Sequence, residues 1–380
     1  MQYFQITEKL LIQNLRNKTK PSGIRVFPQE GNAVELNKQE QRGFDQARKV
    51  RWMVLFWARD LLWKIGRWKS KELHDFLDEV KPDVIFYPIY YPSHLNVMAR
   101  YFHQYTGAPM VGYIADDFYT LRQFSLSPLY WIDRLFKRRQ VKKTIEQCEV
   151  LYVISEIQKK EYEKLFTPPC KILTKCADFK APAPVWPRPE NTVKLIYAGN
   201  LGAGRWESLA MAAKAVEQLR EEGFPVQLDI YSATPMSKAM SKALCRQGST
   251  YHAPVSYGEI LKLQHEADIM LHVEGMSLKS RLAVHQSFST KLVDFFSMGK
   301  CILAIGPGNV ASMDHLIKND AAVTAQTQDE TYEKLKQLLQ DPELVLQHGK
   351  KAYACGAKHH EKECMQAMLW NDLKEAAAKK

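Results

Sequence analysis

The stretch "YAGNLGAGRWESL", residues 197–209, places glycines before an arginine where a buried strand would give way to a helix. Gly199, Asn200, Gly202 and Arg205 could bind an anion there, because glycines let the backbone approach a phosphate and the first N–H groups of a helix are free to donate. Arg205 would add a bidentate cation. The spacing is neither G-x-G-x-x-G nor a Walker A pattern, which argues against a dinucleotide dehydrogenase and a P-loop enzyme. A tight strand-to-helix turn with a solvated arginine is the alternative.

A second helix entrance of this kind begins "SFSTKLVDFFSMGKCILAIGPG", residues 287–308. A cap from Ser289 or Thr290 would leave the next N–H groups at the positive end of the helix dipole, which favours an anion by about 0.3–1 kcal/mol. Lys291 would reinforce this site, and Asp294, one turn later, could accept hydrogen bonds from the vicinal hydroxyls of a sugar. The alternative is an ordinary capped helix with a surface Lys291–Asp294 pair.

Both entrances belong to a region in which apolar strand-like runs alternate with helical patterns, residues 193–325. Continuous Val, Ile and Leu runs separated by helices predict a parallel sheet covered on both faces. Ligands of such sheets bind at the carboxyl ends of the strands. Two anion-binding entrances at one sheet edge favour a ligand that carries a diphosphate. The expected site gathers the residues just after each strand: 199–205, 232–234, 274 and 306–308.

The composition of the 380-residue chain is that of a globular protein, with 46% apolar and 25% charged residues. A net charge of +11 indicates an anionic partner. No nucleic-acid-binding module is recognisable, so a phosphorylated small molecule or a membrane surface is favoured. The seven cysteines lack any C-x-x-C pair, which argues against a disulfide framework and a zinc site. With neither a signal peptide nor a run long enough to span a membrane, we expect a cytoplasmic protein.

Four prolines in "APAPVWPRPEN" exclude helix and sheet and mark a linker between two domains. We expect an N-terminal domain over residues 1–183, the linker over 184–191, a C-terminal domain over 192–357, and a final helix over 358–380 that crosses back to the first domain. The strand and helix alternation before the linker is incomplete. Upstream of Lys69, only "GIRVF" resembles a strand.

In the N-terminal domain, "GYIADDFYTLRQ" places Asp116 and Asp117 at a strand end. Such a carboxylate could act as a general base or bind an acceptor hydroxyl, or it could form an Asx turn that only shapes the loop. His94 also follows a strand, and a structural role is the more frequent one for a lone histidine.

Large aromatic residues alternate with basic ones in "VRWMVLFWARDLLWKIGRWKSK", residues 50–71. This pattern is typical of an interfacial membrane helix, and equally of a core helix with solvated basic flanks. A second basic stretch, "RLFKRRQVKK" over 134–143, could serve the same surface. Trp57, Trp63, Arg138 and Arg139 are therefore candidates for a membrane or acceptor patch.

The pair of motifs, "YAGNLGAGRWESL" and about ninety residues later "SFSTKLVDFFSMGKCILAIGP", resembles the donor-binding domain of GT-B glycosyltransferases. The similarity is greatest to bacterial enzymes of the GT4-like group that build surface polysaccharides. The resemblance implies an α/β fold of two Rossmann-like domains whose parallel sheets face a central cleft. It implies that Arg205 and Lys291 hold the donor diphosphate, that Asp294 stands where the family places a glutamate contacting the ribose, and that Glu274 lies near the donor sugar and takes part in catalysis.

The sequence departs from the family pattern at two places. Gln286 stands eight residues before Asp294, where the family's E-x7-E has an acid. The chain also lacks the initial strand and glycine-rich loop with which such proteins begin, so we expect an N-terminal domain that is incomplete at its start, as in a truncated relative.

The resemblance implies transfer of a sugar from a UDP- or GDP-linked donor to an acceptor hydroxyl. The acceptor would be a glycan or a lipid-linked sugar in cell-surface polysaccharide or glycolipid synthesis. A hexosyltransferase that needs neither a metal nor another cofactor is the expected enzyme. A sugar-nucleotide epimerase of the same fold and a truncated, non-catalytic nucleotide-sugar-binding protein are the alternatives.

Overall fold

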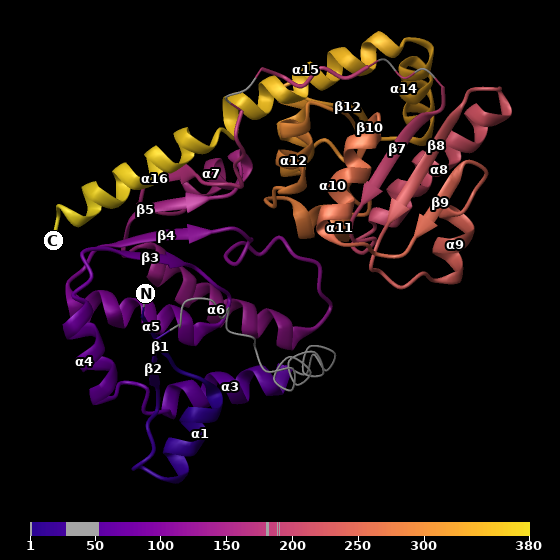
Figure 1. Ribbon diagram of the computed structural model, residues 1–380. Helices are drawn as coiled ribbons and strands as arrows, with labels where there is room; N and C mark the ends of the chain where they lie inside the picture. Colours follow the sequence, from indigo (N-terminus) through magenta and orange to yellow (C-terminus); the bar gives the residue numbers. More distant parts are fainter. Residues whose placement is uncertain (1, 28–52, 180–181, 188, 190) are drawn as a thin grey trace.

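The computed structural model describes residues 2–27, 53–179, 182–187, 189 and 191–380. These residues form two parallel sheets, of four and six strands, and a two-stranded antiparallel sheet near the N-terminus. Figure 1 shows the two parallel sheets in separate domains, joined along one side by the last two helices of the chain.

In the C-terminal sheet, the order in which the chain adds strands reverses at the centre. Its order is β12-β11-β10-β7-β8-β9, so the chain runs outward from β7 to β9 and then returns to β10 on the other side of β7. All five pairs are parallel. In open α/β sheets this reversal creates a crevice beyond the strand ends, where ligands bind. The strands are β7 (Val193–Ala198), β8 (Val226–Tyr231), β9 (Ser249–His252), β10 (Ile269–Val273), β11 (Cys301–Ile305) and β12 (Val323–Ala325).

Helices cover both faces of this sheet because successive strand residues point to opposite sides. Leu195 and Tyr197 of β7 pack in one core with helices α8, α9 and α14, whereas Ile196 packs in a second core with α10, α12, α13 and α15. The helices are α8 (Arg205–Glu221), α9 (Lys238–Leu244), α10 (Tyr257–Glu266), α11 (Leu278–Val284), α12 (Lys291–Met298), α13 (Ala311–Lys318), α14 (Gln328–Gln340) and α15 (Pro342–His359).

The N-terminal parallel sheet has strands in the order of the chain, with β3 (Ile85–Pro88), β4 (Met110–Ile114), β5 (Cys148–Val153) and β6 (Cys170–Ile172). Helices α5 (Ser93–Thr106), α6 (Pro128–Ile145) and α7 (Glu156–Tyr162) follow β3, β4 and β5. Ala99 of α5 and Val141 of α6 pack on one face, against Met110 and Ile114 of β4. The other face holds Val111, which packs against the last helix of the chain.

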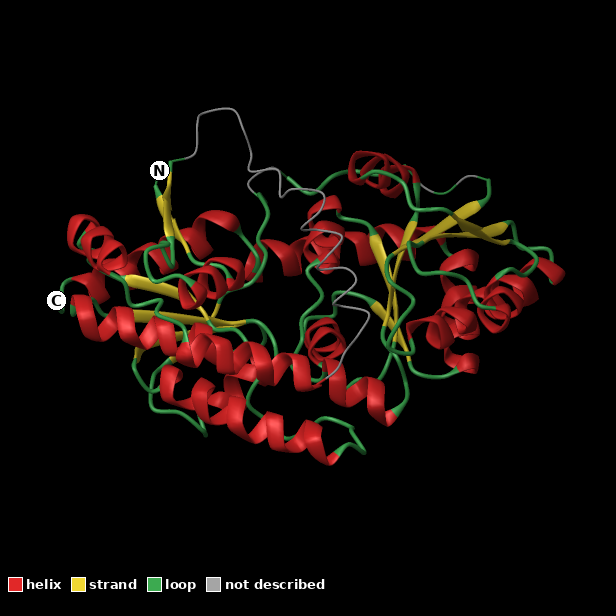
Figure 2. Ribbon diagram, turned by 90° about the horizontal axis from the view of Figure 1, so that it is seen from below, coloured by secondary structure: helices red, strands yellow, loops and turns green. Residues whose placement is uncertain are grey.

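That last helix, α16 (Lys362–Ala377), continues from α15 and lies along the N-terminal sheet (Figures 1 and 2). Its Asp372 accepts a hydrogen bond from the Tyr152 hydroxyl and pairs with Lys171 at 2.5 Å. The chain thus passes between the domains twice, and the two passages are hydrogen-bonded to each other. Ala177 donates to the His360 carbonyl at 3.0 Å, and the Lys362 N–H donates to the Ala177 carbonyl at 3.0 Å.

A separate apolar cluster lies outside the N-terminal sheet, where Leu11, Trp63, Trp68 and Leu73 pack together. The elements of this part of the chain are β1 (Tyr3–Gln5), α1 (Glu8–Arg16), β2 (Ile24–Val26), α3 (Met53–Ile65) and α4 (Lys71–Val80). "GIRVF" does form strand β2, but β2 pairs antiparallel with β1 and does not join the parallel sheet.

Other sequence-based expectations compare as follows. The strands expected on both sides of the linker are present, whereas β9 was not foreseen. All seven cysteines are free thiols. Among the described helices, none combines the length and apolar character needed to cross a membrane. Residues 28–52 lie outside the described residues, so the incomplete start of the N-terminal domain stays a prediction.

Candidate functional site

The glycine-rich loop after β7 is tightly held by its own side chains. The Tyr197 hydroxyl donates to the Asn200 carbonyl at 2.7 Å, and the Asn200 side chain accepts from the Gly202 N–H. Gly204 has φ +75°, a left-handed conformation that favours glycine, and it directly precedes α8. Gly275, from the loop after β10, lies so close that a Cβ there would be 2.2 Å from the Ala203 carbonyl oxygen. The loop is therefore preorganised at the N-terminus of α8.

Arg205, the first residue of α8, forms an ion pair with Glu274, which follows β10. Their side chains meet at 3.1 Å between Nη2 and Oε2, and Glu274 is only 2% exposed. Burial raises the pKa of the Glu274 carboxyl, and the charges of Arg205 and Lys291 oppose this shift. The sequence-predicted donor-site residues Arg205 and Glu274, 69 positions apart, thus come together at the sheet reversal.

Lys291 reaches the same place from α12. Its Nζ donates to the Ala198 carbonyl at 2.8 Å, at the end of β7. A Cβ at position 199 would lie 2.4 Å from this Nζ, so Gly199 leaves room for the lysine. The loss of surrounding solvent lowers the pKa of Lys291, and the charge of Arg205 lowers it further. A lysine whose charged form is disfavoured by burial and by a neighbouring cation belongs to a site that an anion would stabilise.

His272 lies beneath this group and was not singled out from the sequence. It is buried within β10, and its Nε2 lies 3.6 Å from a Glu274 oxygen and has no hydrogen-bond partner among the described residues. Burial lowers its pKa to about 3, and Arg205 and Lys291 add to the effect, so it is neutral at pH 7. The signal in the sequence was a single polar residue within the apolar run "IMLHV".

The entrance of α12 differs from the expected cap. Thr290 is the N-cap residue, but its side chain makes no capping hydrogen bond. The Ser289 N–H donates to Ser312 Oγ at 2.9 Å, and the Leu292 N–H donates to the Ser289 carbonyl at 3.1 Å. The predicted side-chain cap was therefore wrong. The Ser289 N–H is bound by Ser312 of α13, and the Leu292 N–H is bound by the loop backbone.

A cavity of about 520 Å³ lies at the carboxyl ends of β7 and β8, and Lys291 is the one of the two cations that lines it. Lys291 and Asp294 form one wall, and Tyr257 and Pro254 supply apolar surface on the other side. Asp294 pairs with Lys175 of the chain passage between the domains, at 2.5 Å. The predicted contact of Asp294 with a ribose therefore has a competing partner in this structure.

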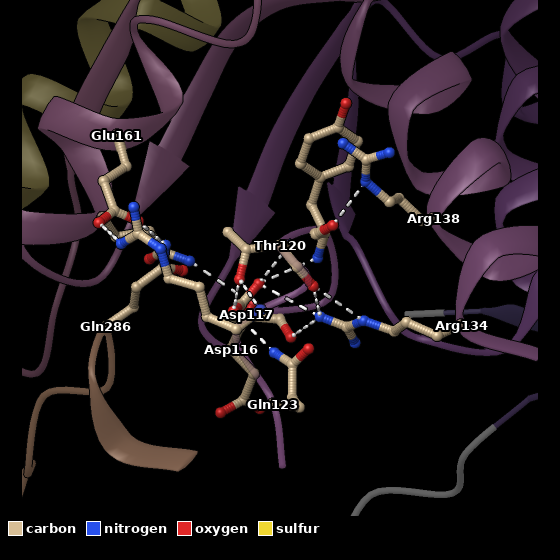
Figure 3. A network of polar contacts seen from close by, with 11 residues as sticks. Asp116, Asp117, Thr120, Gln123, Arg134, Arg138, Glu161 and Gln286 are labelled. Carbon is tan, nitrogen blue, oxygen red and sulfur yellow. Dashed lines mark hydrogen bonds and ion pairs between the residues drawn. The ribbon is translucent and has the colours of Figure 1, made fainter. Parts of the chain in front are cut away.

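Asp117, predicted as a candidate base, holds the loop after β4 together (Figure 3). One of its oxygens accepts from the Thr120 N–H at 2.7 Å, and the other accepts from Gln123 at 2.8 Å. The guanidinium of Arg134, only 3% exposed, donates to the Asp117 carbonyl at 2.8 Å and to its carboxylate at 3.3 Å. The Asx-turn alternative describes this residue, because both carboxylate oxygens of Asp117 are occupied within the loop and by Arg134.

Asp116 points away from this network (Figure 3). Its side chain makes no hydrogen bond or ion pair with another residue in the described part of the chain. Burial raises the pKa of the Asp116 carboxyl, and the charge of Asp117 adds to the shift. Asp116 is therefore the carboxylate of the pair that is free to act on a ligand.

A second cluster joins the domains beside this loop (Figure 3). Glu161 of α7 accepts from Gln286 at 2.5 Å and lies 3.1 Å from His285 Nε2. Arg122 also pairs with Glu161. Burial alone would raise the pKa of Glu161, but the hydrogen bonds from Gln286, His285 and Arg122 outweigh burial and lower it. Gln286, the departure from the family motif, therefore serves the contact between the domains.

The four residues of the predicted membrane or acceptor patch divide in the structure. Trp63 is 5% exposed and packs in the N-terminal apolar cluster, and Arg138 donates to the Tyr119 carbonyl at 2.9 Å, so both serve the fold. Trp57 is 36% exposed, and its indole donates to Asp133 at 3.1 Å. Arg139 is exposed. Residues 50–52 of the predicted aromatic helix lie outside the described residues.

Comparison with known proteins agrees with this architecture. A family model described as "Glycosyl transferase-like" matches residues 209–369. The sucrose-phosphate synthase of Thermosynechococcus elongatus has a TM-score of 0.58 and 11% identity, over 81% of this chain and 77% of that one. HepE of Anabaena, solved with UDP, has a TM-score of 0.61 and 10% identity, over 82% of this chain and 84% of that one. No curated protein sequence matches this chain.

These similarities define the fold. The chain has the GT-B architecture of two Rossmann-like domains, as expected from the resemblance of its motifs. The region matched by the family model includes Lys291 and Glu274. Among the described residues there is no group of three or more His, Cys, Asp or Glu side chains that could hold a metal ion.

Proposed function

We propose that this protein transfers a sugar from a nucleotide-diphosphate donor to an acceptor hydroxyl. The observation that carries the proposal is the convergence of Arg205, Lys291 and Glu274 at the sheet reversal, where Lys291 also lines a cavity of about 520 Å³. The matched family and the GT-B fold support glycosyl transfer as the type of reaction.

Arg205 and Lys291 would hold the donor diphosphate and stabilise the negative charge that develops on it as the glycosidic bond breaks. Gly199, Asn200 and Gly202 would let the backbone approach the phosphates, and the N-terminus of α8 would add its free N–H groups. At the α12 entrance, Thr290 would contribute through its backbone, whereas the Ser289 N–H already donates to Ser312 Oγ and would only shape the entrance. With two cations in place, we propose that no metal or other cofactor is required.

The nucleoside would occupy the cavity lined by Tyr257 and Pro254, with Asp294 beside the ribose. UDP and GDP are the proposed nucleotides, and the solved complex of HepE with UDP supports the first. Glu274 would lie next to the donor sugar. Asp116, on the opposite domain, would accept the proton of the acceptor hydroxyl, since its raised pKa makes it a better base than an ordinary aspartate.

For the biological setting, we propose a hexosyltransferase of the GT4-like group that acts in polysaccharide or glycolipid synthesis. It would work in the cytoplasm, at the inner face of a membrane, with a glycan or lipid-linked acceptor. Exposed Arg139 and half-exposed Trp57, on neighbouring helices of the N-terminal domain, support such a peripheral contact.

The first experiment is a melting-temperature shift with UDP, GDP, ADP and CMP, on the wild type and on Lys291→Ala. A ligand at about 100 times its dissociation constant stabilises a fold by about 2.7 kcal/mol, which is easily detected. Stabilisation by one nucleoside diphosphate that Lys291→Ala abolishes supports the proposed donor site. Lys336→Ala is the matched control, because this lysine pairs with Glu222 on the surface, away from the site.

The nucleotide so identified then serves in turnover assays with its sugar conjugates. Release of nucleotide that depends on an acceptor supports transfer. Conversion of the sugar without an acceptor would point to an epimerase, and binding without turnover to a non-catalytic protein. No shift with any nucleotide would overturn the preformed donor site.

A further inference from the structure

A second and larger cavity, of about 1150 Å³, lies in the N-terminal domain between α3, the N-terminus of α5, and α6. It is more than twice the volume of the proposed donor cavity, and the donor proposal leaves it unused. One wall consists of exposed apolar side chains. Leu61 is 57% exposed, Ile132 45% and Phe136 68%, and Trp57 extends the same surface. Apolar groups that remain exposed around a cavity mark a binding site for apolar material.

The rim of this cavity is cationic. Lys64, Arg67 and Lys69 line it, and all three are exposed. Lys64 and Arg67 form no ion pair within the part of the chain that the structure describes. Lys69 lies 4.1 Å from the centre of the Tyr101 ring. Uncompensated cations next to an apolar wall suit a ligand with an apolar chain and an anionic head.

The floor of the cavity is polar and incompletely satisfied. His94 stacks on Trp63 at 4.4 Å between ring centres, and its Nδ1 lies 3.7 Å from Asp60 Oδ1. Both atoms are buried and lack a hydrogen-bond partner in the described residues. Buried polar atoms normally have partners, so this pair of unsatisfied atoms distinguishes the floor from an ordinary packed core.

This cavity and the Asp116 loop are built on the same helix. Asp133 of α6 lies in the floor, where it pairs with Lys137 at 2.8 Å and accepts from Tyr91 at 3.1 Å. The next residue, Arg134, holds Asp117. A ligand in the cavity therefore touches the helix that fixes the proposed base loop.

We propose that the cavity binds a single amphipathic lipid with a phosphate head, as the lipid part of the acceptor. The inference rests on the proposed function, since it names the acceptor class of that reaction. The apolar chain lies against Leu61, Ile132 and Phe136, and Lys64 and Arg67 bind the phosphate. The positive charge of the rim is complementary to the phosphate head of the lipid. The exposed apolar wall is complementary to its apolar chain.

The test is calorimetric titration of the full chain with dodecyl phosphate below its critical micelle concentration. Dodecyl maltoside, with the same chain but no charge, and inorganic phosphate, with the charge but no chain, are run in parallel. We expect saturable binding of one dodecyl phosphate per chain. Binding of the two comparison ligands should be at least about tenfold weaker, because each lacks one of the two contact surfaces.

Two kinds of variant locate the binding. Leu61→Glu and Phe136→Glu alter the wall, and Lys64→Glu combined with Arg67→Glu alters the rim. Each should weaken dodecyl phosphate binding by about tenfold or more. Trp370→Glu, at a 59% exposed position on α16, is the matched control and should bind as the wild type does. The altered side chains are exposed, so the fold should persist, which circular dichroism checks.

Wild-type affinity in all cavity variants, equal affinity for inorganic phosphate, or binding without saturation would each overturn the proposal. The nucleotide-induced melting shift separates it from the donor site. Cavity variants that lose dodecyl phosphate binding but keep that shift confirm an independent lipid site. A wild-type protein that binds dodecyl phosphate but no nucleotide would sink the proposed function while leaving the lipid site in place.

Discussion

The two parallel sheets present their carboxyl ends in different ways. The C-terminal sheet reverses its strand order between β7 and β10, and the crevice so formed holds Arg205, Lys291 and Glu274. The N-terminal sheet runs from β3 to β6 without a reversal among the described strands. There, the hydrogen bonds of Asp117 hold the loop after β4 in place.

This difference indicates that the two domains contribute different kinds of structure to the proposed site. A reversal separates two neighbouring loops and leaves space that backbone N–H groups and cations can line. Where no reversal exists, a loop can present a single side chain only if other side chains hold it rigidly. Asp117 and Arg134 provide that support for Asp116, so one domain offers a pocket and the other a supported residue.

The largest loss of stability should come from removing Asp117, which supports the loop after β4. Asp117→Ala leaves the buried guanidinium of Arg134 without its carboxylate, and loss of one partner of a buried pair costs about 3–5 kcal/mol. Urea unfolding should show the loss as a lower midpoint. Asp75→Ala, which breaks an exposed pair with Lys71, is the control and should change stability by less than about 1 kcal/mol. A stable Asp117→Ala protein would contradict the structural role.

Removing a cation from the crevice should affect turnover in addition to stability, because Arg205 is the partner of the buried Glu274. Arg205→Ala should lower kcat by about 100- to 1000-fold, the usual effect of losing one preorganised donor to a developing negative charge. Arg246→Ala, at a surface pair with Glu217, should leave kcat unchanged. If Arg205→Ala lowered stability but not kcat, the crevice would not be the donor site.

Asp116 should determine the acid limb of the pH dependence of kcat/KM. Asp116 must be deprotonated to accept a proton, and its pKa is raised, so kcat/KM should fall at a higher pH than for an ordinary aspartate. Asp116→Asn should remove this acid limb and lower kcat by about 100-fold. An unchanged acid limb in this variant would assign the base elsewhere, with His94 as the next residue to test.

The link between the two domains should depend on pH. The pKa of Glu161 is lower in the folded protein than the ordinary 4.5. Its contribution to stability is therefore present above that value and is lost as the pH falls through the folded pKa. Glu161→Gln should cost about 1–3 kcal/mol at pH 7. The difference from the wild type in urea should shrink below pH 4.5, and a constant difference would count against the cluster.

The smallest effect concerns the partner of Asp294. Lys175→Ala should change stability by less than about 1 kcal/mol, because the pair with Asp294 is partly exposed. It should also tighten nucleoside diphosphate binding a few-fold, since Asp294 becomes free for the ribose. The gain should vanish for the 2′-deoxy nucleotide. Equal gains for both nucleotides would remove Asp294 from the proposed ribose contact.

The sequence was sufficient for the C-terminal fold, because buried parallel strands are continuous apolar runs that periodicity reveals. β9 was missed because it is an edge strand with the polar sequence "STYH". Arg205 and Lys291 could be selected since glycines and helix starts mark the ends of their strands. Glu274 could be selected for the same reason, but its pairing with Arg205, 69 residues away, could not be foreseen, nor could the pairing of Asp294 with Lys175, 119 residues away.

The N-terminal domain shows the limit of local patterns more sharply. Asp116 and Asp117 are adjacent and chemically identical, and only the position of Arg134 on α6 distinguishes their roles. Trp57 and Trp63 share one helix, yet Trp63 turns into a core with Leu11, which no spacing rule foresees. The pairing of His94 with Asp60 likewise depends on how α3 packs against α5.

The two passages of the chain between the domains, hydrogen-bonded at Ala177, His360 and Lys362, have a mechanical consequence. One connecting strand would let the domains swing and twist freely. Two connecting segments hydrogen-bonded side by side allow the domains to bend toward and away from each other but resist twisting of one domain against the other. Relative motion of the two domains should therefore follow a single arc, which would return the Asp116 loop to the same place relative to the C-terminal domain in each cycle.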